Sequence, residues 1–221
     1  AAGSVLVAPY GGVERRFSTA PYCVGIPREG QAPLLLDFAT SIVAEGKVLV
    51  ASQGGKPIPT DALIGPDGKV SDDPRLLYGD YTPTGPRDGR KGQGAIRAFG
   101  EHKGSGLAFM CEMLGGALSG NGATKFDRKF ANGMFSFYVD PKVVDPEGFF
   151  PAEVARYTAF VKGSKRAKED QEILVPGEAE DRTRAKRLKE GIPLADDTWA
   201  SILAAARSVG VDETRIQAAT A

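Results

Sequence analysis

Short apolar runs separated by turn residues mark the first part of the chain. Residues 4–8 are rich in β-forming side chains, and a turn signal follows them at Pro9, Gly11 and Gly12. A second apolar run occupies residues 22–26, and a proline ends it. The pattern therefore predicts two short strands joined through a glycine-rich connection.

The next apolar run contains three consecutive leucines at residues 34–36, which is consistent with a buried strand. Asp37 follows this run, and Thr40 or Ser41 is positioned to cap a helix that starts near Ile42. A carboxylate where a strand meets a helix start commonly accepts the hydroxyls of a nucleotide ribose. It can equally cap the turn, and the residues themselves leave both interpretations open.

Residues 101–120, which read EHKGSGLAFMCEMLGGALSG, predict the helix around which the rest of the chain is organised. Leu107, Cys111, Leu114 and Leu118 recur at spacings of four, three and four, which is an apolar stripe at helical period. We therefore expect this face of the helix to be buried.

The start of this helix holds the one histidine of the chain, His102, beside Lys103. Gly104 and Gly106 allow the backbone to bend or to approach a ligand closely. A charged turn with glycines at a helix N-terminus is suited to an anion or to the polar edge of a cofactor. The alternative is a helix start that carries a solvated His–Lys pair.

Residues 54–100 are rich in proline and glycine and show little periodicity. Such a stretch in a compact domain is typically a functional lid, a loop that covers a cofactor or a mobile segment. Asp67 and Gly68 predict a hairpin turn between residues 63–64 and Val70. The other aspartates of this stretch lack metal-ligand spacing, so we expect no metal site there.

Further elements are predicted after residue 120. We expect a strand, an amphipathic helix, a brief strand, a charged helix and a final helix, in that order, at residues 133–139, 146–163, 173–175, 179–190 and from 197 onward. No GxGxxG sequence follows any predicted strand, which counts against a doubly wound parallel fold.

The composition of the 221 residues is typical of a soluble globular protein, with 42% hydrophobic and 25% charged residues. Basic and acidic residues balance at 28 each, so no overall field favours nucleic acid or an anionic membrane surface. The apolar runs are shorter than a membrane span. Cys23 and Cys111 lack a CxxC spacing and are predicted to be reduced core thiols of a cytoplasmic protein.

The one histidine lies between a glutamate and a lysine, so no Ser-His-Asp or Cys-His catalytic pattern is recognisable in the sequence. A zinc site would need more histidine or cysteine ligands than the chain has. Arg15 and Arg16 could grip a phosphate or form the solvated face of a loop. The sequence begins without an initiator methionine or a signal-type apolar run, so we expect a fragment or a processed segment. The residues alone indicate a mixed α/β domain that binds a cofactor or an anion.

Five segments in order resemble the malate/L-lactate dehydrogenase family of NAD(P)-dependent oxidoreductases, a group separate from the Rossmann-type dehydrogenases. They read APYGGVERRFSTAPYCVGIPR, PLLLDFATSIVAEGK, FGEHKGSGLAFMCEMLGGALSG, ILVPGE and KRLKEGIPLADDTW. Together they span nearly the whole chain, apart from the loops at residues 72–96 and 122–130. Within the family, the chain is most similar to the hydroxycarboxylate dehydrogenase branch.

The resemblance implies an α/β (α+β) fold with a largely antiparallel sheet and flanking helices, and not a doubly wound Rossmann fold. Residues 1–170 would form the NAD(P)-binding domain, and residues 171–221 would be a C-terminal helical segment that packs with the family's N-terminal region. The resemblance also implies a homodimer, NAD or NADP as the cofactor, and a small 2-hydroxy or 2-oxo acid such as malate or lactate as the substrate.

The cofactor contacts of the family carry over to matching positions of this sequence. Asp37 would lie near the cofactor ribose, and His102 would contact the dinucleotide. Arg15, Arg16 and Arg28 could meet a 2′-phosphate, whereas Asp37 favours a free ribose hydroxyl, so NAD and NADP both stay open. The implied cofactor-binding residues are Leu35, Leu36, Asp37, Phe38, Ala39, His102, Lys103, Asn132, Gly177, Glu178, Ala179 and Glu180.

The sequence departs from the family pattern in two places. The family commonly has Thr-Asn-Pro where this chain has Thr19-Ala20-Pro21. The family's proton-transferring histidine lies in a Ser-x-His-Gly motif that these 221 residues do not contain, so no catalytic residue is assigned. We therefore expect an N-terminally truncated oxidoreductase that transfers a hydride between NAD(P) and a small acid. The alternative is a non-catalytic dinucleotide-binding fragment.

Overall fold

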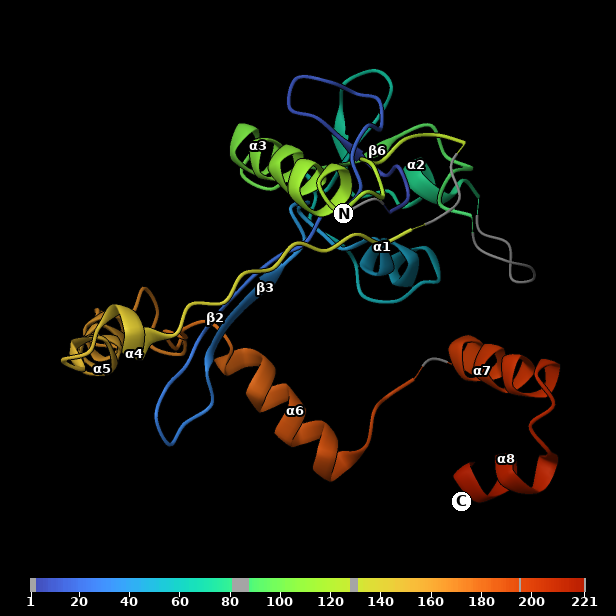
Figure 1. The fold of residues 1–221 in the computed structure, drawn as a ribbon. Coiled ribbons are helices and arrows are strands. Elements are labelled where there is room, and N and C mark those ends of the chain that lie inside the picture. The colour runs from blue at the N-terminus through green and yellow to red at the C-terminus, as the bar shows by residue number, and fades with distance from the viewer. Residues whose placement is uncertain (1–2, 81–87, 128–130, 195, 221) are drawn as a thin grey trace. The chain divides into compact units, whose positions relative to one another are not determined.

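A computed structural model describes residues 3–80, 88–127, 131–194 and 196–220 (Figure 1). The chain divides into two compact units, Ala1–Ser164 and Lys165–Ala221, and each unit is described by itself. The assignment of NAD(P) binding to residues 1–170 and of a packing role to residues 171–221 stays a prediction.

A four-stranded mixed sheet forms the centre of the first unit, with the strand order β1-β6-β4-β5. The strands are β1 (Val7–Ala8), β4 (Leu63–Ile64), β5 (Val70–Ser71) and β6 (Ala95–Arg97). β1 is parallel to β6, while β4 is antiparallel to both β5 and β6. The hairpin predicted at Asp67 and Gly68 is confirmed, because Gly68 has a φ of +80° and β4 pairs with β5 directly across it.

The core of this unit lies between the sheet and two helices, α1 (Glu45–Ser52) and α2 (Arg75–Tyr78). Its side chains come from β1, β4, β6 and both helices, and removal of their apolar surface from water stabilises the arrangement by roughly 25 cal/mol per Å². The fully buried members are Val7, Val48, Ala62, Leu63, Leu77 and Ile96.

A separate two-stranded antiparallel sheet contains β2 (Tyr22–Ile26) and β3 (Leu34–Phe38) (Figure 1). Both predicted strands are confirmed, but the predicted burial is wrong. Leu35 and Leu36 are 43% and 42% exposed, and Cys23 is exposed instead of being a core thiol. In the part of the chain that the structure describes, no third strand pairs with this sheet, and most of its side chains are exposed.

Helix α1 begins later than predicted, and the expected caps have other partners. The hydroxyl of Thr40 donates to the carbonyl oxygens of Thr19 and Ala20, each at 3.0 Å. Ser41 forms an antiparallel bridge with Ala98. The first helical residue is therefore Glu45, and no side chain caps the helix.

The organising helix is α3 (His102–Cys111), which continues without a break as a π-helix, η1 (Glu112–Ala117). Its predicted apolar stripe is not the buried face, since Leu114 and Leu118 are 44% and 66% exposed. The buried side is made of small residues and one carboxylate, and small residues let neighbouring backbone approach closely. These buried positions are Gly104, Ala108, Glu112, Gly115 and Gly116.

The chain after η1 is more helical than its pattern predicts. Residues 133–139 and 173–175 form no strand, and neither segment joins a sheet among the described residues. The predicted amphipathic helix, the charged helix and the helix from residue 197 are confirmed. A further helix after residue 210 was not predicted. The helices are α4 (Pro141–Val144) and α5 (Phe149–Lys162) in the first unit, and α6 (Glu178–Glu190), α7 (Asp196–Ser208) and α8 (Glu213–Thr220) in the second.

The described residues contain neither a candidate membrane span nor a candidate metal site. None of their helices combines the length and the apolar character that a membrane crossing requires. No cluster of three or more histidine, cysteine, aspartate or glutamate side chains among them could hold a metal ion.

Candidate functional site

Backbone pairing brings together two segments that were predicted separately, the end of β3 and the start of α3. The carbonyl oxygen of Thr40 accepts a hydrogen bond from the Phe99 N–H at 3.1 Å. The Ile42 N–H donates to the Arg97 carbonyl at 2.9 Å, and Ser41 bridges to Ala98 between these two contacts. Thr40 follows Ala39 directly, and Phe99 precedes His102 by three residues, so the two predicted cofactor segments lie close together.

Aromatic side chains reinforce this junction. The rings of Phe38 and Phe99 meet edge to face, with centroids 5.4 Å apart and an interplanar angle of 85°. The Tyr22 ring lies 5.8 Å from Phe38 on the neighbouring strand. Edge-to-face pairs of this kind are favourable because a positive ring edge meets a negative ring face. The pairing therefore fixes the end of β3 against the turn that leads into α3.

The turn before α3 is conformationally strained. Gly100 has a φ of +53°, and Glu101, which carries a side chain, has φ +56° and ψ −115°. A non-glycine residue held in such a region costs on the order of 1–3 kcal/mol. Strain of this kind persists only where surrounding contacts fix the turn. The turn in this chain sets the position of His102, the first residue of α3.

The first turn of α3 uses its backbone N–H groups internally. The N–H groups of Lys103, Gly104 and Ser105 donate to the carbonyls of residues 100, 99 and 101. An anion at this helix start would therefore meet the side chains of His102 and Lys103, both of which are exposed, instead of a row of free amides.

The loop after β1 lies against the same helix start. The Tyr10 N–H donates to the Ser105 hydroxyl at 3.0 Å, and the Tyr10 ring meets the His102 ring at a centroid distance of 5.9 Å. The interplanar angle of 64° is close to an edge-on contact. Tyr10 therefore flanks the imidazole on one side and leaves it accessible.

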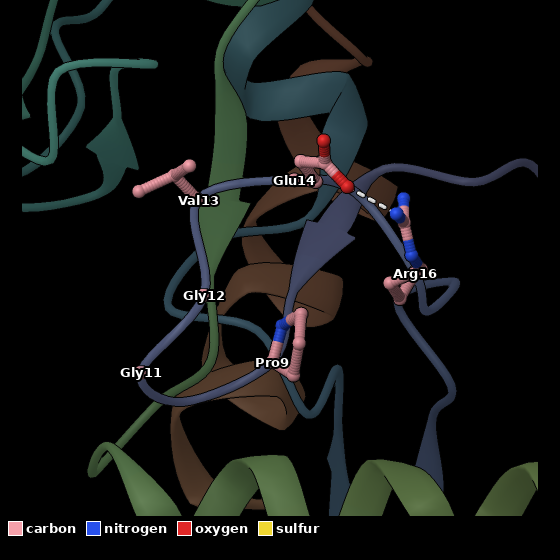
Figure 2. A pocket seen from close by; sticks show the side chains of 6 residues that line it. All are labelled: Pro9, Gly11, Gly12, Val13, Glu14 and Arg16. Atoms are coloured by element: carbon pink, nitrogen blue, oxygen red, sulfur yellow. Dashed lines mark hydrogen bonds and ion pairs between the residues drawn. The ribbon is translucent and has the colours of Figure 1, made fainter.

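A shallow open pocket lies in this loop (Figure 2). Figure 2 shows the Arg16 guanidinium turned toward the Glu14 carboxylate, with which it forms an ion pair. The same guanidinium lies 5.9 Å from the centroid of the Phe126 ring, a cation–π distance. The lining residues are Pro9, Gly11, Gly12, Val13, Glu14 and Arg16. The Arg16 guanidinium is therefore already engaged by Glu14 and Phe126.

Arg15 fits neither of the two predicted roles. Its guanidinium is buried and donates to the carbonyl oxygens of Gly94 and Gly92, each at 2.6 Å, and to that of Gly89. Burial lowers its pKa from the usual value, and the charge of Asp88 opposes that shift. Its donors hold the loop at residues 89–94 in place, so they are not available for a phosphate.

A buried carboxylate ties η1 to the segment before β2. The Glu112 carboxylate accepts hydrogen bonds from the Ser18 hydroxyl at 2.6 Å and from the Thr124 hydroxyl and N–H, each at 2.8 Å. Burial alone would raise the pKa of Glu112, but these bonds outweigh it and hold the pKa below its usual range. No sequence motif distinguishes Glu112, and a lone glutamate in an apolar helix is the only signal of its role.

The predicted cofactor residues differ in how far the structure places them. Leu35, Leu36, Asp37, His102 and Lys103 are exposed around the junction, while Phe38 and Ala39 are half-buried within it. Their carboxylate, imidazole and ammonium groups suit the hydroxyls and phosphates of a dinucleotide. Thr40, Phe99 and Tyr10 complete this neighbourhood; the sequence suggested Thr40 only as a helix cap and gave Phe99 and Tyr10 no role of their own.

The remaining predicted residues belong to other segments of the chain. The Asn132 carbonyl accepts a hydrogen bond from the Asn121 amide at 3.3 Å, and Gly133 packs against the carbonyl of Gly115 in η1. Gly177 precedes α6 with a φ of +97°, and the Glu178 carboxylate accepts the Val175 N–H at 3.1 Å. Gly177, Glu178, Ala179 and Glu180 belong to the second unit, so their part in the site stays a prediction.

Comparison with known proteins defines the class of this chain. A model of the family described as "Malate/L-lactate dehydrogenase" matches residues 1–203, and the chain belongs to that family. The resemblance found in the sequence is therefore confirmed.

Particular relatives agree with this assignment. Hydroxycarboxylate dehydrogenase B of Escherichia coli (strain K12) is 38% identical over 222 aligned positions, covering 98% of this chain and 58% of the relative. L-sulfolactate dehydrogenase of Methanothermobacter thermautotrophicus is 32% identical, covering 93% and 56%. The structure of malate dehydrogenase from Pyrococcus horikoshii OT3 matches with a TM-score of 0.72 at 26% identity, covering 95% and 56%. The chain thus spans somewhat more than half the length of these relatives.

Proposed function

We propose that the chain supplies the cofactor-binding part of an oxidoreductase that transfers a hydride between NAD(P) and C2 of a small 2-hydroxy or 2-oxo acid. The observation that carries the proposal is the contact between the end of β3, whose last residues include Asp37, and the turn that begins α3 at His102 and Lys103. The names of the relatives, dehydrogenases of hydroxycarboxylates, sulfolactate and malate, support an acid as the substrate.

The residues of the junction have separate tasks in this proposal. The Asp37 carboxylate accepts hydrogen bonds from ribose hydroxyls, and His102 and Lys103 donate to the pyrophosphate. The bound nicotinamide would take or give the hydride, while the protein orients it and excludes water. We propose that this binding takes place without a Rossmann fold, since no GxGxxG loop is present in the sequence.

The charges around Asp37 favour NAD over NADP. A 2′-phosphate beside this carboxylate would be repelled unless a cation lay near it. Arg15 has its donors committed to buried carbonyls, and Arg28 donates to the Ala32 carbonyl at 2.7 Å, beyond the Ile26–Leu34 end of the hairpin. Asp37 pairs with Cys23 at the other end of the ladder, so neither Arg15 nor Arg28 is placed to meet a 2′-phosphate there. Arg16 and Lys103 are exposed cations, so the preference for NAD rests on the Asp37 carboxylate.

Titration of the purified chain with NADH, followed by nucleotide fluorescence, tests the proposal. We expect saturable binding, and His102→Ala should weaken it by about 1–3 kcal/mol, or about 5- to 150-fold, if the imidazole bonds a charged group. Lys69→Ala, an exposed lysine beside the distant hairpin turn, should leave the dissociation constant unchanged. Absence of NADH binding to the unsubstituted chain would contradict the proposal.

A non-catalytic dinucleotide-binding protein is the second candidate. The observation that favours it is the position of the single histidine at the start of α3, where it would serve the cofactor and not the substrate carbonyl. No residue of the chain is assigned as the proton donor. Steady-state assays with malate, lactate and related acids separate the two, since turnover at ordinary enzyme rates would exclude the non-catalytic role.

The homodimer implied by the resemblance forms part of the same proposal. Sedimentation equilibrium of the chain measures it directly, and a mass of one chain at all concentrations would count against it.

A further inference from the structure

We infer that Phe99 is a positioning residue, one that sets the spacing between the two arms of the proposed cofactor site without touching the cofactor. This inference rests on the proposed function. One arm is the end of β3, which carries Asp37, and the other is the first turn of α3, which carries His102 and Lys103.

The backbone of Phe99 bonds to both arms. Its N–H donates to the Thr40 carbonyl at 3.1 Å, and its carbonyl accepts the Gly104 N–H at 3.0 Å. Thr40 is fully buried and is itself fixed by bonds to the carbonyls of Thr19 and Ala20. Thr40 therefore fixes the position of Phe99, and Phe99 in turn fixes the first turn of α3 through Gly104.

The ring of Phe99 contacts both arms as well. Its edge-to-face contact with Phe38, at 5.4 Å between centroids, holds the last residue of β3. On the other side, a Cβ at Gly104 would overlap the Phe99 carbonyl oxygen and lie 2.9 Å from the ring atom Cδ1. Glycine at position 104 thus lets the helix rest directly on Phe99.

The alternation of side chains along β3 places Phe99 and Asp37 on opposite faces of the strand. Successive side chains of β3 point to opposite faces, so Phe38 and Asp37 face opposite ways. Phe99 packs with Phe38 and therefore supports β3 from behind the face that presents Asp37. A shift of the Phe99 ring would change the spacing between Asp37 and His102 while leaving both side chains chemically intact.

The test compares NADH dissociation constants of the chain and its variants by fluorescence titration. Phe99→Leu keeps an apolar side chain but removes the ring, and it should weaken NADH binding about three- to tenfold. In the His102→Ala background the same substitution should have a smaller effect, because only Lys103 of the arm that Phe99 positions still contributes. A general loss of folding would weaken binding equally in both backgrounds.

Three further variants serve as controls and guard against misfolding. Phe99→Tyr keeps the ring and should retain the NADH affinity of the unsubstituted chain. Phe38→Leu removes the same ring contact from the other side and should match Phe99→Leu, with no additional loss in the double variant. Phe109→Leu makes the matched substitution at an exposed position of α3 and should change nothing.

The outcomes distinguish this inference from the proposed function. If the unsubstituted chain does not bind NADH, both are overturned. If it binds, and His102→Ala weakens binding, but Phe99→Leu has no effect or acts equally in both backgrounds, only the positioning role is overturned. Should Phe99→Leu fail to fold, Phe38→Leu in the two backgrounds decides the question in the same way.

Discussion

Single residues with unusual environments hold the first unit of this protein together. Arg15 fixes a loop through its buried guanidinium, and Glu112 fastens η1 to Ser18 and Thr124. Neither could be identified from the sequence, because a basic pair and a glutamate in a helix are ordinary surface features until the chain folds over them. Asp37 and His102, in contrast, were recognisable because their neighbours in sequence match a family pattern.

Replacement of Glu112 by glutamine should lower the free energy of unfolding by about 2 kcal/mol at neutral pH, since an amide cannot accept all the hydrogen bonds that the carboxylate accepts. The folded state depresses the pKa of Glu112, so its contribution is fully present above its unfolded pKa and is lost as the pH falls through the folded value. Urea denaturation between pH 7 and about pH 3 should show the difference between the two proteins shrinking only in the acidic range.

Glu153→Gln is the matched control for that measurement. Glu153 lies on the surface, where it pairs with Arg156, and exposed ion pairs contribute little to stability. If Glu112→Gln lowers the free energy of unfolding no more than Glu153→Gln does, the structural role of the buried carboxylate is contradicted.

Replacement of Glu101 by glycine should raise the free energy of unfolding by about 1 kcal/mol, because glycine adopts a φ of +56° without strain. The lost ion pair to Arg97 is long, at 3.9 Å, and exposed, so it offsets little of this gain. Glu147→Gly, at an exposed turn position without positive φ, should give no gain in the same urea titration. A Glu101 variant that is less stable than the parent would show that the turn is not strained.

Among the elements, residue preferences over a few positions predicted those strands and turns that short-range interactions determine. The strands 22–26 and 34–36 and the turn at Asp67 and Gly68 follow from short-range preferences, and the structure contains them. Burial failed as a prediction for Leu35, Leu36 and the stripe on α3, because burial depends on which elements pack together. The alternation at residues 133–139 likewise predicts a strand, but a strand requires a partner.

The glycines of α3 give a matched pair of substitutions. Gly104→Ala should destabilise the protein by about 2 kcal/mol, because its Cβ would overlap the backbone of Phe99. Gly106→Ala meets no atom within 4 Å and should stabilise the helix by up to about 1 kcal/mol through its better helix propensity. Urea denaturation of both variants checks the packing of α3 on Phe99, and equal effects at the two positions would contradict it.

At the scale of the whole molecule, the chain has two compact units that meet in sequence at residues 164 and 165. The segment that follows α5 has no helix or strand until α6, and Lys165, Arg166 and Lys168 are exposed there. Limited trypsin digestion should therefore cut among these three residues before it cuts at Arg182, Arg184 or Arg187 within α6. Mass spectrometry identifies the order, and earlier cleavage inside α6 would contradict the division.

We propose that a dinucleotide binds where the end of β3 meets the start of α3. Amide hydrogen exchange of the chain, with and without saturating NADH, locates the bound dinucleotide. NADH should slow exchange in residues 34–40 and 99–106, with no comparable change in α1 or at the β4–β5 turn. Protection confined to other segments, or no protection despite measured binding, would contradict it.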